Sequence, residues 1–196
     1  MREIPNLETQ RLLIRPFEMD DLQAIHTVLN RAFGDGSRAD DANAIEQRRP
    51  WLQWASVNPH ELAKLSQPPY GDRAIVLKAT GALIGSVGLV PCLDAFDQLP
   101  SFGGTPNAMR TTEMGLFWAV DPAQQGKGYA TEAARILIDF VFREEKLKRI
   151  VATTEYDNFA SQAVMTKLGM RLERNPFPEP SWLQMVGILE RPMTSA

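Results

Sequence analysis

The first third of the chain switches between strand-like and helix-like spacing of its apolar residues. Apolar and polar residues partly alternate in LETQRLLIRPF, residues 7–17, which predicts a β-strand. After residue 21 the spacing lengthens to that of a helix, with one apolar face formed by Leu22, Ile25, Val28 and Leu29. A second helical pattern covers residues 42–65, and Pro50 and Pro59 predict that this helix is interrupted.

The middle of the chain has the pattern of a hairpin followed by a long irregular segment. RAIVLKA and LIGSVGLVPCL are rich in β-forming residues and are joined by Thr80-Gly81, which predicts two paired strands. Residues 94–110 are too long and irregular for a tight turn, and loops of this length are often functional. The next strand is predicted at residues 111–120.

The last third alternates strands with helices. A helix is predicted at about residues 128–145, then the strand KRIVATT, and then a short helix at 158–168 that ends at Gly169. MRLERN and SWLQMVGILE predict two final strands. This order predicts an α/β fold with a mixed sheet and helices on its faces, formed as a single domain over residues 1–196.

Composition narrows the class of protein. The chain has 196 residues, 44% of them hydrophobic, and a net charge of −3, which disfavours general attraction to nucleic acid. The charged N-terminus lacks a signal-peptide pattern, and no apolar run approaches the roughly 20 residues of a membrane span. We therefore expect a cytoplasmic protein without nucleic-acid or membrane partners. Its single cysteine, Cys92, is expected to be an apolar strand residue rather than a catalytic thiol.

A glycine-rich turn, AQQGKGYATEA, lies between the strand at 111–120 and its following helix. A helix start leaves main-chain N–H groups unpaired at the positive end of the helix dipole, which favours an anion. Gly126 and Gly128 allow that anion to approach closely. A triphosphate loop needs Gly-Lys-Ser/Thr, and a dinucleotide turn needs a third glycine where Thr131 stands, so both of these readings fail. A plain strand-to-helix turn remains the alternative.

Together with three other segments, this turn resembles the GNAT superfamily of acyl-CoA-dependent N-acyltransferases. The segments are TEMGLFWAVDP before the turn, NFASQAVMTKLGM after it, and the opening LETQRLLIRPFEMDD, which is similar to the branch containing ribosomal-protein N-terminal acetyltransferases. The resemblance implies a sheet of about seven strands flanked by about four helices and splayed between the fourth and fifth strands. It also implies that the turn binds the coenzyme A pyrophosphate through the main chain of Gln125, Gly126, Lys127, Gly128, Tyr129, Ala130 and Thr131. Ala123 departs from the family signature, which usually has Gln or Arg there.

The resemblance also implies where the rest of the cofactor lies. The main chain of Trp118, Ala119 and Val120 would pair with pantetheine like an added strand. Asn158 would bind the pantetheine arm, and Ser161 would lie near the thiol. Many relatives protonate the thiolate with a Tyr where this chain has Met165, so Ser161 is the candidate substitute. Both residues also suit a simple helix start.

Glu113 is the candidate general base. It lies among apolar neighbours in the strand at 111–120, where desolvation favours the neutral acid that results from taking a proton. Glutamates hold the base role at the matching strand position in many GNAT enzymes. A structural or solvent-facing carboxylate is the alternative reading.

The predicted activity is transfer of an acetyl group from acetyl-CoA to a primary amine by direct attack, in a monomer or homodimer without a metal. The alternative is a non-catalytic acyl-CoA sensor on the same fold. Loops 34–43, 94–110 and 175–181 are expected to wall the acceptor pocket, with the acceptor left open between a peptide N-terminus, a small amine, an aminoglycoside and an amino-acid analogue. His26 and His60 lack obvious ligand partners, and Trp51 and Trp54 read as core residues.

Overall fold

The computed structural model describes residues 4–34, 41–67 and 70–192. Its strands are β1 (Leu7–Glu8), β2 (Leu12–Pro16), β3 (Gly71–Leu77), β4 (Leu83–Asp94), β5 (Thr111–Val120), β6 (Arg149–Thr154), β7 (Arg171–Arg174) and β8 (Met185–Glu190). Its α-helices are α1 (Leu22–Phe33), α2 (Ala42–Lys64), α3 (Tyr129–Glu144) and α4 (Phe159–Leu168). The strands form one mixed sheet in the order β1-β2-β3-β4-β5-β6-β8-β7, which confirms the predicted fold class with one strand more than expected.

Close contacts divide the chain into two compact units, Met1–Leu89 with Phe117–Asp139, and Val90–Leu116 with Phe140–Ala196. Strands β4 and β5 and helix α3 each pass from one unit into the other. The sequence predicted a single domain, and that statement stays a prediction.

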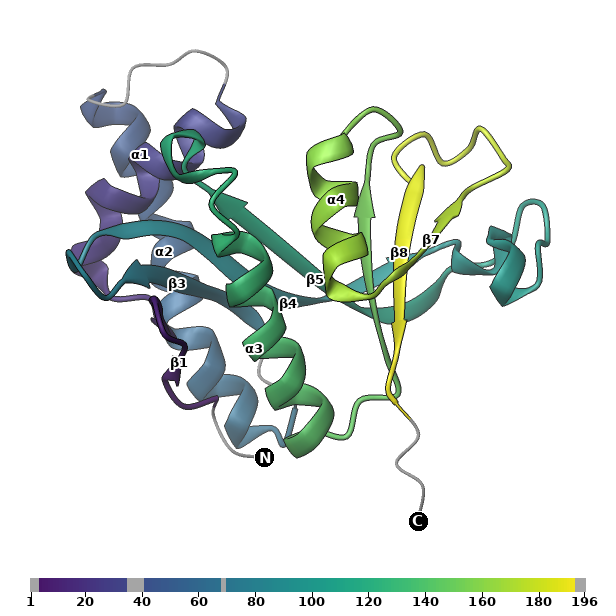
Figure 1. The fold of residues 1–196 in the computed structure, drawn as a ribbon, viewed down its shortest axis with the longest axis horizontal. Coiled ribbons are helices and arrows are strands. Elements are labelled where there is room, and N and C mark those ends of the chain that lie inside the picture. The colour runs from purple at the N-terminus through teal and green to yellow at the C-terminus, as the bar shows by residue number, and fades with distance from the viewer. Residues whose placement is uncertain (1–3, 35–40, 68–69, 193–196) are drawn as a thin grey trace. The chain divides into compact units, whose positions relative to one another are not determined.

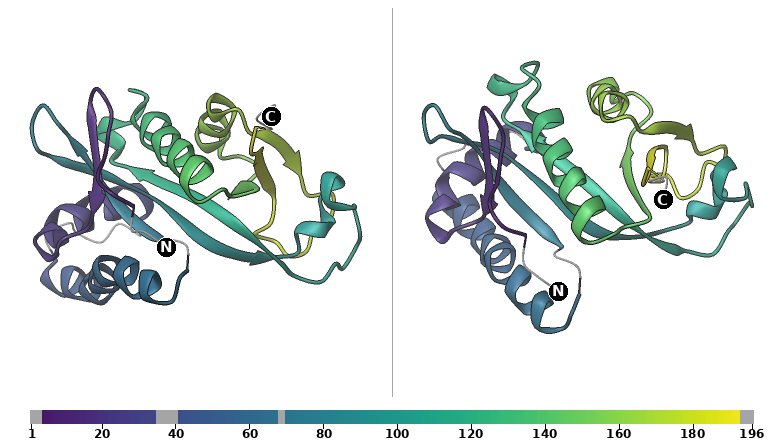
Figure 2. Two further views of the ribbon diagram at one scale, coloured as in Figure 1. Left: turned by 90° about the horizontal axis from the view of Figure 1, so that it is seen from below. Right: turned by 60° about the horizontal axis from the view of Figure 1, so that its bottom comes forward.

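The first unit has helices on both faces of its strands. Figures 1 and 2 show α1 and α2 on one face of β2, β3 and β4, with α3 on the other. Between the strands and α1 and α2 lies a core of buried residues: Phe17, Leu22, Ile25, Val28, Leu52, Ala55, Ala74 and Val76. Alternate residues of β3 point to opposite faces, so Asp72 lies on the same face as Ala74 and Val76, toward these two helices.

The second unit is built around the antiparallel ladder of β6, β8 and β7, with six register pairs between β6 and β8. Strand β5 pairs with β6 in parallel, and within the described residues the register comprises one pair, Gly115 opposite Val151. These are the fourth and fifth strands predicted from sequence, so the parallel contact is short at the place where a splay was expected. A core of Val151, Val186, Ile188 and Leu183 also buries Phe96 and Leu99.

Two sequence expectations about element boundaries were wrong. The predicted strand at 7–17 is a hairpin, because the Thr9 hydroxyl accepts a hydrogen bond from the Leu12 amide at 2.9 Å and reverses the chain. Helix α2 runs through Pro50 and Pro59 without interruption. The burial of its apolar side against the core outweighs the hydrogen bonds that the prolines remove.

The irregular segment at 94–110 contains two short 3-10 turns, Phe96–Gln98 and Pro100–Phe102. The side chain of Asn175, which is 1% exposed, donates to Gln98 and to the Leu183 carbonyl at 2.9 Å each. The segment is therefore anchored within the second unit by buried polar contacts as well as by Phe96 and Leu99.

Two glycines allow the end of β5 to approach β4 in the first unit. A Cβ atom at Gly85 would lie 2.3 Å from the Ala119 carbonyl oxygen, and one at Gly88 would lie 2.7 Å from the Phe117 ring. A side chain at Gly85 would push the β5 backbone away, and a side chain at Gly88 would collide with the Phe117 ring.

We predict that Gly85→Ala destabilises the protein by about 1–3 kcal/mol, because the added methyl group must displace backbone rather than a mobile side chain. Urea unfolding measures the loss. Gly81→Asn is the control, since Gly81 has a positive φ of 70°, which Asn tolerates, and no atom within 4 Å of a Cβ placed there. Equal losses in the two variants would contradict the close approach of β5 to β4.

Candidate functional site

The glycine turn connects β5 and α3 in the first unit. A 3-10 turn at Pro122–Gln124 follows the strand, and Asp121 caps it by accepting from the Ala123 amide at 2.9 Å. Gly126 and Gly128 then adopt φ values of 75° and 83°, which disfavour side chains with a Cβ atom. A Cβ placed at Gly126 would meet no atom within 4 Å, so the space beside it is open.

Most of the main-chain amides predicted to bind phosphate lack an acceptor among the residues that the structure describes. The Gln125 amide donates to the Pro122 carbonyl at 3.3 Å, and the Gln125 side chain donates to the Val120 carbonyl at 3.0 Å. For residues 126–131, in contrast, the described part of the chain provides no recorded acceptor for the N–H groups. Unpaired amides at the positive end of α3 provide an anion-binding site.

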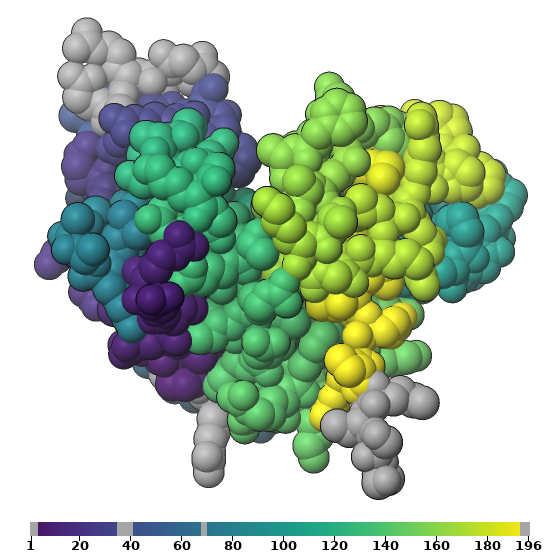
Figure 3. Space-filling view, viewed as in Figure 1, coloured from purple at the N-terminus to yellow at the C-terminus, as the bar shows by residue number. Residues whose placement is uncertain are grey.

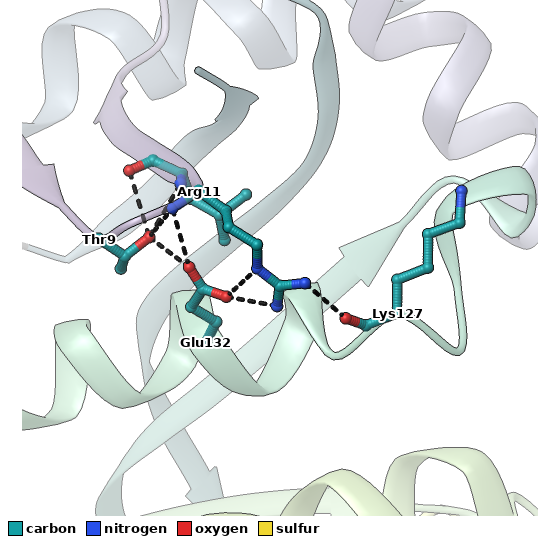
Figure 4. Close-up of polar contacts among 5 residues, drawn as sticks. Thr9, Arg11, Lys127 and Glu132 are labelled. Atoms are coloured by element: carbon teal, nitrogen blue, oxygen red, sulfur yellow. Dashed lines mark hydrogen bonds and ion pairs between the residues drawn. The ribbon is translucent and has the colours of Figure 1, made fainter. Parts of the chain in front are cut away.

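Arg11 holds the turn in place (Figure 4). Its guanidinium donates to the Lys127 carbonyl at 3.0 Å and, through Nε, to Glu132 at 2.7 Å. Thr9 donates to the same Glu132 carboxylate. The purple N-terminal segment therefore lies against the green residues of α3, as the space-filling view of Figure 3 also shows. Burial opposes ionisation of Glu132, but the hydrogen bonds from Thr9 and Arg11 outweigh it and lower the pKa of this carboxyl.

Side chains of the turn itself are also constrained. The Arg11 guanidinium lies 4.5 Å from the centroid of the Tyr129 ring, a cation–π contact. The Lys127 ammonium donates to the Ala123 carbonyl at 3.1 Å and to Gln124 at 2.8 Å. The turn is thus preorganised by its neighbours before any ligand binds.

A cavity of about 620 Å³ lies within the first unit. Residues of α1, α2, β3, β4 and the end of β5 line it, together with Gly34 after α1: His26, Leu29, Asn30, Phe33, Gly34, Ala44, Gln47, Arg48, Trp51, Asp72, Ser86, Phe117 and Ala119. Of the loops expected to wall an acceptor pocket, the first contributes Gly34, while residues 35–40 lie outside the described residues. The part that loops 94–110 and 175–181 play stays a prediction.

Asp72 is a buried carboxylate in this cavity. It accepts a hydrogen bond from the Ser86 hydroxyl at 3.1 Å and another from the Trp51 side chain. Asp72 forms no ion pair within the part of the chain that the structure describes. Burial raises the pKa of Asp72 to about 6, although the two hydrogen bonds lower it in part.

His26 lines the same cavity from α1. It is 3% exposed, and neither of its ring nitrogens has a hydrogen-bond partner among the described residues. Buried polar atoms in proteins are nearly always paired, so two unpaired nitrogens beside a cavity indicate a place where a bound molecule supplies the partner.

Glu113, the predicted base, is held by an arginine in the second unit. The Arg149 guanidinium donates to both Glu113 carboxylate oxygens, with Nε to Oε2 at 2.9 Å, and Arg149 also lies 4.2 Å from the centroid of the Phe102 ring. These hydrogen bonds raise the pKa of Arg149 despite its burial. Both carboxylate oxygens of Glu113 therefore already accept hydrogen bonds from one guanidinium. The geometry therefore supports the alternative of a structural partner, and the base role of Glu113 stays a prediction.

The predicted pantetheine and thiol residues are placed as follows. Trp118 is half-buried on β5, and Ala119 and Val120 are buried. Asn158 is the N-cap of α4, where its side-chain oxygen accepts from the Ser161 amide at 3.0 Å. Met165 is buried in the same helix. The roles of Asn158 and Ser161 toward a cofactor stay predictions.

Other candidate chemistry finds no support. Cys92 is a free, half-buried thiol, and burial, together with the carboxylates of Asp94 and Glu113, raises its pKa, which disfavours a thiolate. Among the described residues, no group of three His, Cys, Asp or Glu side chains is arranged to hold a metal ion. None of the described helices has the length and apolarity needed to span a membrane.

Two parts of this site were missed from sequence. Arg11 lies in the opening strand motif, but its contact with a turn more than 100 residues later has no local signal. Asp72 had one signal that was overlooked, namely a carboxylate two positions before the apolar run of β3, where alternation places it on the core-facing side.

We predict that the stability of Asp72→Asn relative to the natural protein increases with pH. Folding raises the pKa of this acid from 3.8 to about 6. Below pH 4 the buried group is protonated and costs no folding free energy for burying a charge, whereas above pH 6 it is ionised and carries the full cost. That penalty amounts to roughly 3 kcal/mol, and Asn lacks it. Urea unfolding between pH 4 and 7.5 measures the difference. Asp20→Asn, at an exposed carboxylate, is the control, and the same pH-dependent gain in both variants would contradict the burial of Asp72.

Comparison with known proteins confirms the predicted family. Residues 11–171 match the acetyltransferase (GNAT) domain family. An uncharacterized N-acetyltransferase, YnaD of Bacillus subtilis, is 30% identical over 172 residues, covering 86% of this chain and 84% of the relative.

Solved structures show the same fold. The ribosomal-protein-S5-alanine acetyltransferase of Vibrio fischeri has a TM-score of 0.63 at 17% identity, covering 98% of this chain and 100% of its own. A microcin C7 self-immunity acetyltransferase, solved in complex with acetyl-CoA and AMP, has a TM-score of 0.61 at 14% identity, covering 92% of this chain and 91% of its own. With this match over most of its length, the chain belongs to the GNAT acetyltransferase family.

Proposed function

We propose that the protein transfers an acetyl group from acetyl-CoA to a primary amine, and that the turn at residues 126–131 binds the pyrophosphate of acetyl-CoA. The observation that carries this proposal is the set of main-chain N–H groups at the start of α3 that have no acceptor among the described residues. Phosphate oxygens satisfy such groups, and the helix dipole adds to the attraction. The family and the acetyl-CoA bound by one structural neighbour support the same ligand.

The residues of the turn fit a diphosphate. Gly126 leaves open space on its Cβ side, and at Gly128 the nearest atom to an added Cβ is Arg11 Nη2 at 3.5 Å. Arg11 engages the Lys127 carbonyl, so that this oxygen, which would repel phosphate, is already paired. The Gln125 amide already donates to the Pro122 carbonyl. We therefore assign the pyrophosphate-binding main chain, here called the cradle, to residues 126–131 rather than 125–131.

The thioester end of acetyl-CoA is assigned to β5. Strand-like pairing of pantetheine with the main chain of Trp118 and Ala119 would bring the acetyl carbonyl close to a main-chain N–H that polarises it. The Val120 carbonyl is already engaged by the Gln125 side chain at 3.0 Å, so it contributes less than the sequence predicted. Ser161 remains the candidate donor to the departing thiolate, and Asn158 the candidate contact to the pantetheine arm.

We predict that coenzyme A stabilises the protein and that Gly128→Asp abolishes this effect. At 100 times Kd, binding adds roughly 2.7 kcal/mol to the free energy of unfolding. An Asp side chain at Gly128 places bulk and negative charge in the cradle. Thermal unfolding with and without coenzyme A measures the stabilisation.

Gly81→Asp is the matched control, because Gly81 also has a positive φ and open space around it but lies in the turn between β3 and β4. This control variant should keep the full stabilisation by coenzyme A. If Gly128→Asp, still folded, responded to coenzyme A like the control, the cradle would be assigned to the wrong residues.

A further inference from the structure

We propose that the cavity of the first unit binds the acceptor as a primary ammonium, and that Asp72 both holds this group and takes its proton. This assignment rests on the proposed function for the reaction itself. It differs from the sequence prediction in the residue that accepts the proton, and it defines the class of acceptor.

The first argument is charge. Asp72 is 9% exposed, receives hydrogen bonds from the neutral groups of Ser86 and Trp51, and has no ion pair within the described part of the chain. A buried carboxylate without a cation is costly, and the cost is removed when a cation binds beside it. A ligand ammonium supplies the missing charge, and the cavity provides the space for it.

The second argument is the unpaired histidine. His26 lines the cavity from α1 with both ring nitrogens lacking partners among the described residues. Asp72 of β3 lacks a cation and His26 of α1 lacks hydrogen-bond partners among the described residues, and one molecule in the shared cavity would supply both. We assign His26 to a hydroxyl or amide group of that molecule, next to its ammonium.

The third argument is position. Phe117 and Ala119 of β5 line the cavity, and Ala119 belongs to the strand segment assigned to pantetheine. An amine in the cavity therefore lies against the strand that would hold the thioester. Gly88, opposite Asp72 in the β3–β4 register, has no side chain, so the Phe117 ring can pack over it.

The lining defines the acceptor. Trp51, Phe117, Phe33 and Leu29 provide aromatic and aliphatic surface, while Asp72 provides the only carboxylate among the lining residues that the structure describes. A volume of about 620 Å³ suits a small organic molecule. The cavity therefore fits a primary ammonium joined to an apolar, preferably aromatic body, either as a free amine or as a peptide N-terminus.

The proton balance follows from this placement. Asp72 removes one proton from the ammonium and leaves a neutral amine, whose nitrogen forms a bond to the acetyl carbonyl carbon while the carbon–sulfur bond breaks. Once this bond has formed, the nitrogen loses one further proton. That proton ends on the departing sulfur, giving the free thiol. Asp72 then releases its proton to water, so that the products are the acetylated amine, the thiol and one proton.

The raised pKa of Asp72, about 6, suits this role. The carboxylate is ionised at neutral pH, and its pKa is close enough to neutral pH for it to accept and release a proton. The charged or titratable groups that face it across the cavity are His26 of α1 and Arg48 of α2, while β4 presents Ser86 and β5 presents Phe117. Arg48 lies over the Trp51 ring, 5.7 Å from its centroid, and the same Trp51 side chain donates a hydrogen bond to Asp72.

The test compares Asp72→Asn with Glu113→Gln. Phenethylamine and a tripeptide with an N-terminal phenylalanine serve as acceptors, and kcat and KM are measured from pH 5 to 9. We expect Asp72→Asn to lose about 10²–10⁴-fold in kcat/KM and to lose the acid limb of its pH profile. Glu113→Gln should keep that limb, and both variants should bind acetyl-CoA normally.

A binding measurement separates this inference from the proposed function. Calorimetry without acetyl-CoA should show that phenethylamine binds and that 2-phenylethanol, which lacks the charge, binds at least about tenfold more weakly. Asp72→Asn should abolish this preference, and Asp20→Asn should keep it. A protein that binds the amine through Asp72 but transfers no acetyl group would refute the proposed function and leave the ammonium site standing.

Three results would overturn the inference. These are an unchanged pH profile in Asp72→Asn, loss of the acid limb in Glu113→Gln instead, and equal binding of the amine and the alcohol. If binding depends on Asp72, the acceptor with the higher kcat/KM identifies the source of the ammonium group. Preference for phenethylamine indicates a small-molecule substrate, and preference for the tripeptide indicates a protein N-terminus.

Discussion

Main-chain amides bind a diphosphate only if nothing in the protein already uses them, and the start of α3 is arranged to meet that condition. Positive φ values at Gly126 and Gly128 carry the chain through the turn without Cβ atoms in the way. Arg11 bonds to the Lys127 carbonyl from outside the turn and fixes the direction of that peptide. Because Glu132 orients Arg11 in return, the N-terminal hairpin and helix α3 are both needed to keep the cradle open.

The same unit also contains a buried carboxylate, that of Asp72, which has no compensating cation among the described residues. The protein keeps this group in its folded state at a cost that Ser86 and Trp51 offset only in part. Such a cost is explained when a substrate supplies the compensating charge, and perturbed carboxyls in cavities are typical of functional sites. In our proposal, the cradle that follows β5 holds the acyl donor, and the cavity lined by Phe117 and Ala119 of β5 holds the acceptor.

Much of the fold followed from the sequence because its signals are local. The change of period at α1, the glycine turn before α3 and the left-handed Gly169 after α4 each depend on a few adjacent residues. The hairpin at Thr9 and the continuous α2 could not be predicted in this way. Thr9 uses its side chain to reverse the chain, and α2 tolerates two prolines because tertiary packing stabilises it.

The site was less predictable, because its decisive contacts join distant positions. Arg11 and Glu132 are 121 positions apart in the sequence. Glu113 is 36 positions from Arg149, whose hydrogen bonds favour a structural role for Glu113. Asp72 becomes notable only when Ser86, Trp51 and the cavity surround it. Sequence patterns predicted the glycine turn before α3, whereas the electrostatic state of each carboxyl depends on neighbours that only the folded chain brings together.

Hydrogen exchange at the amides of residues 126–131, measured with and without coenzyme A, tests the binding of the acyl donor most directly. If these amides hold the pyrophosphate, their exchange slows markedly when coenzyme A binds, while the amides of the control turn at residues 79–82 exchange at an unchanged rate. Unchanged exchange at residues 126–131 under saturating coenzyme A would contradict the main-chain cradle.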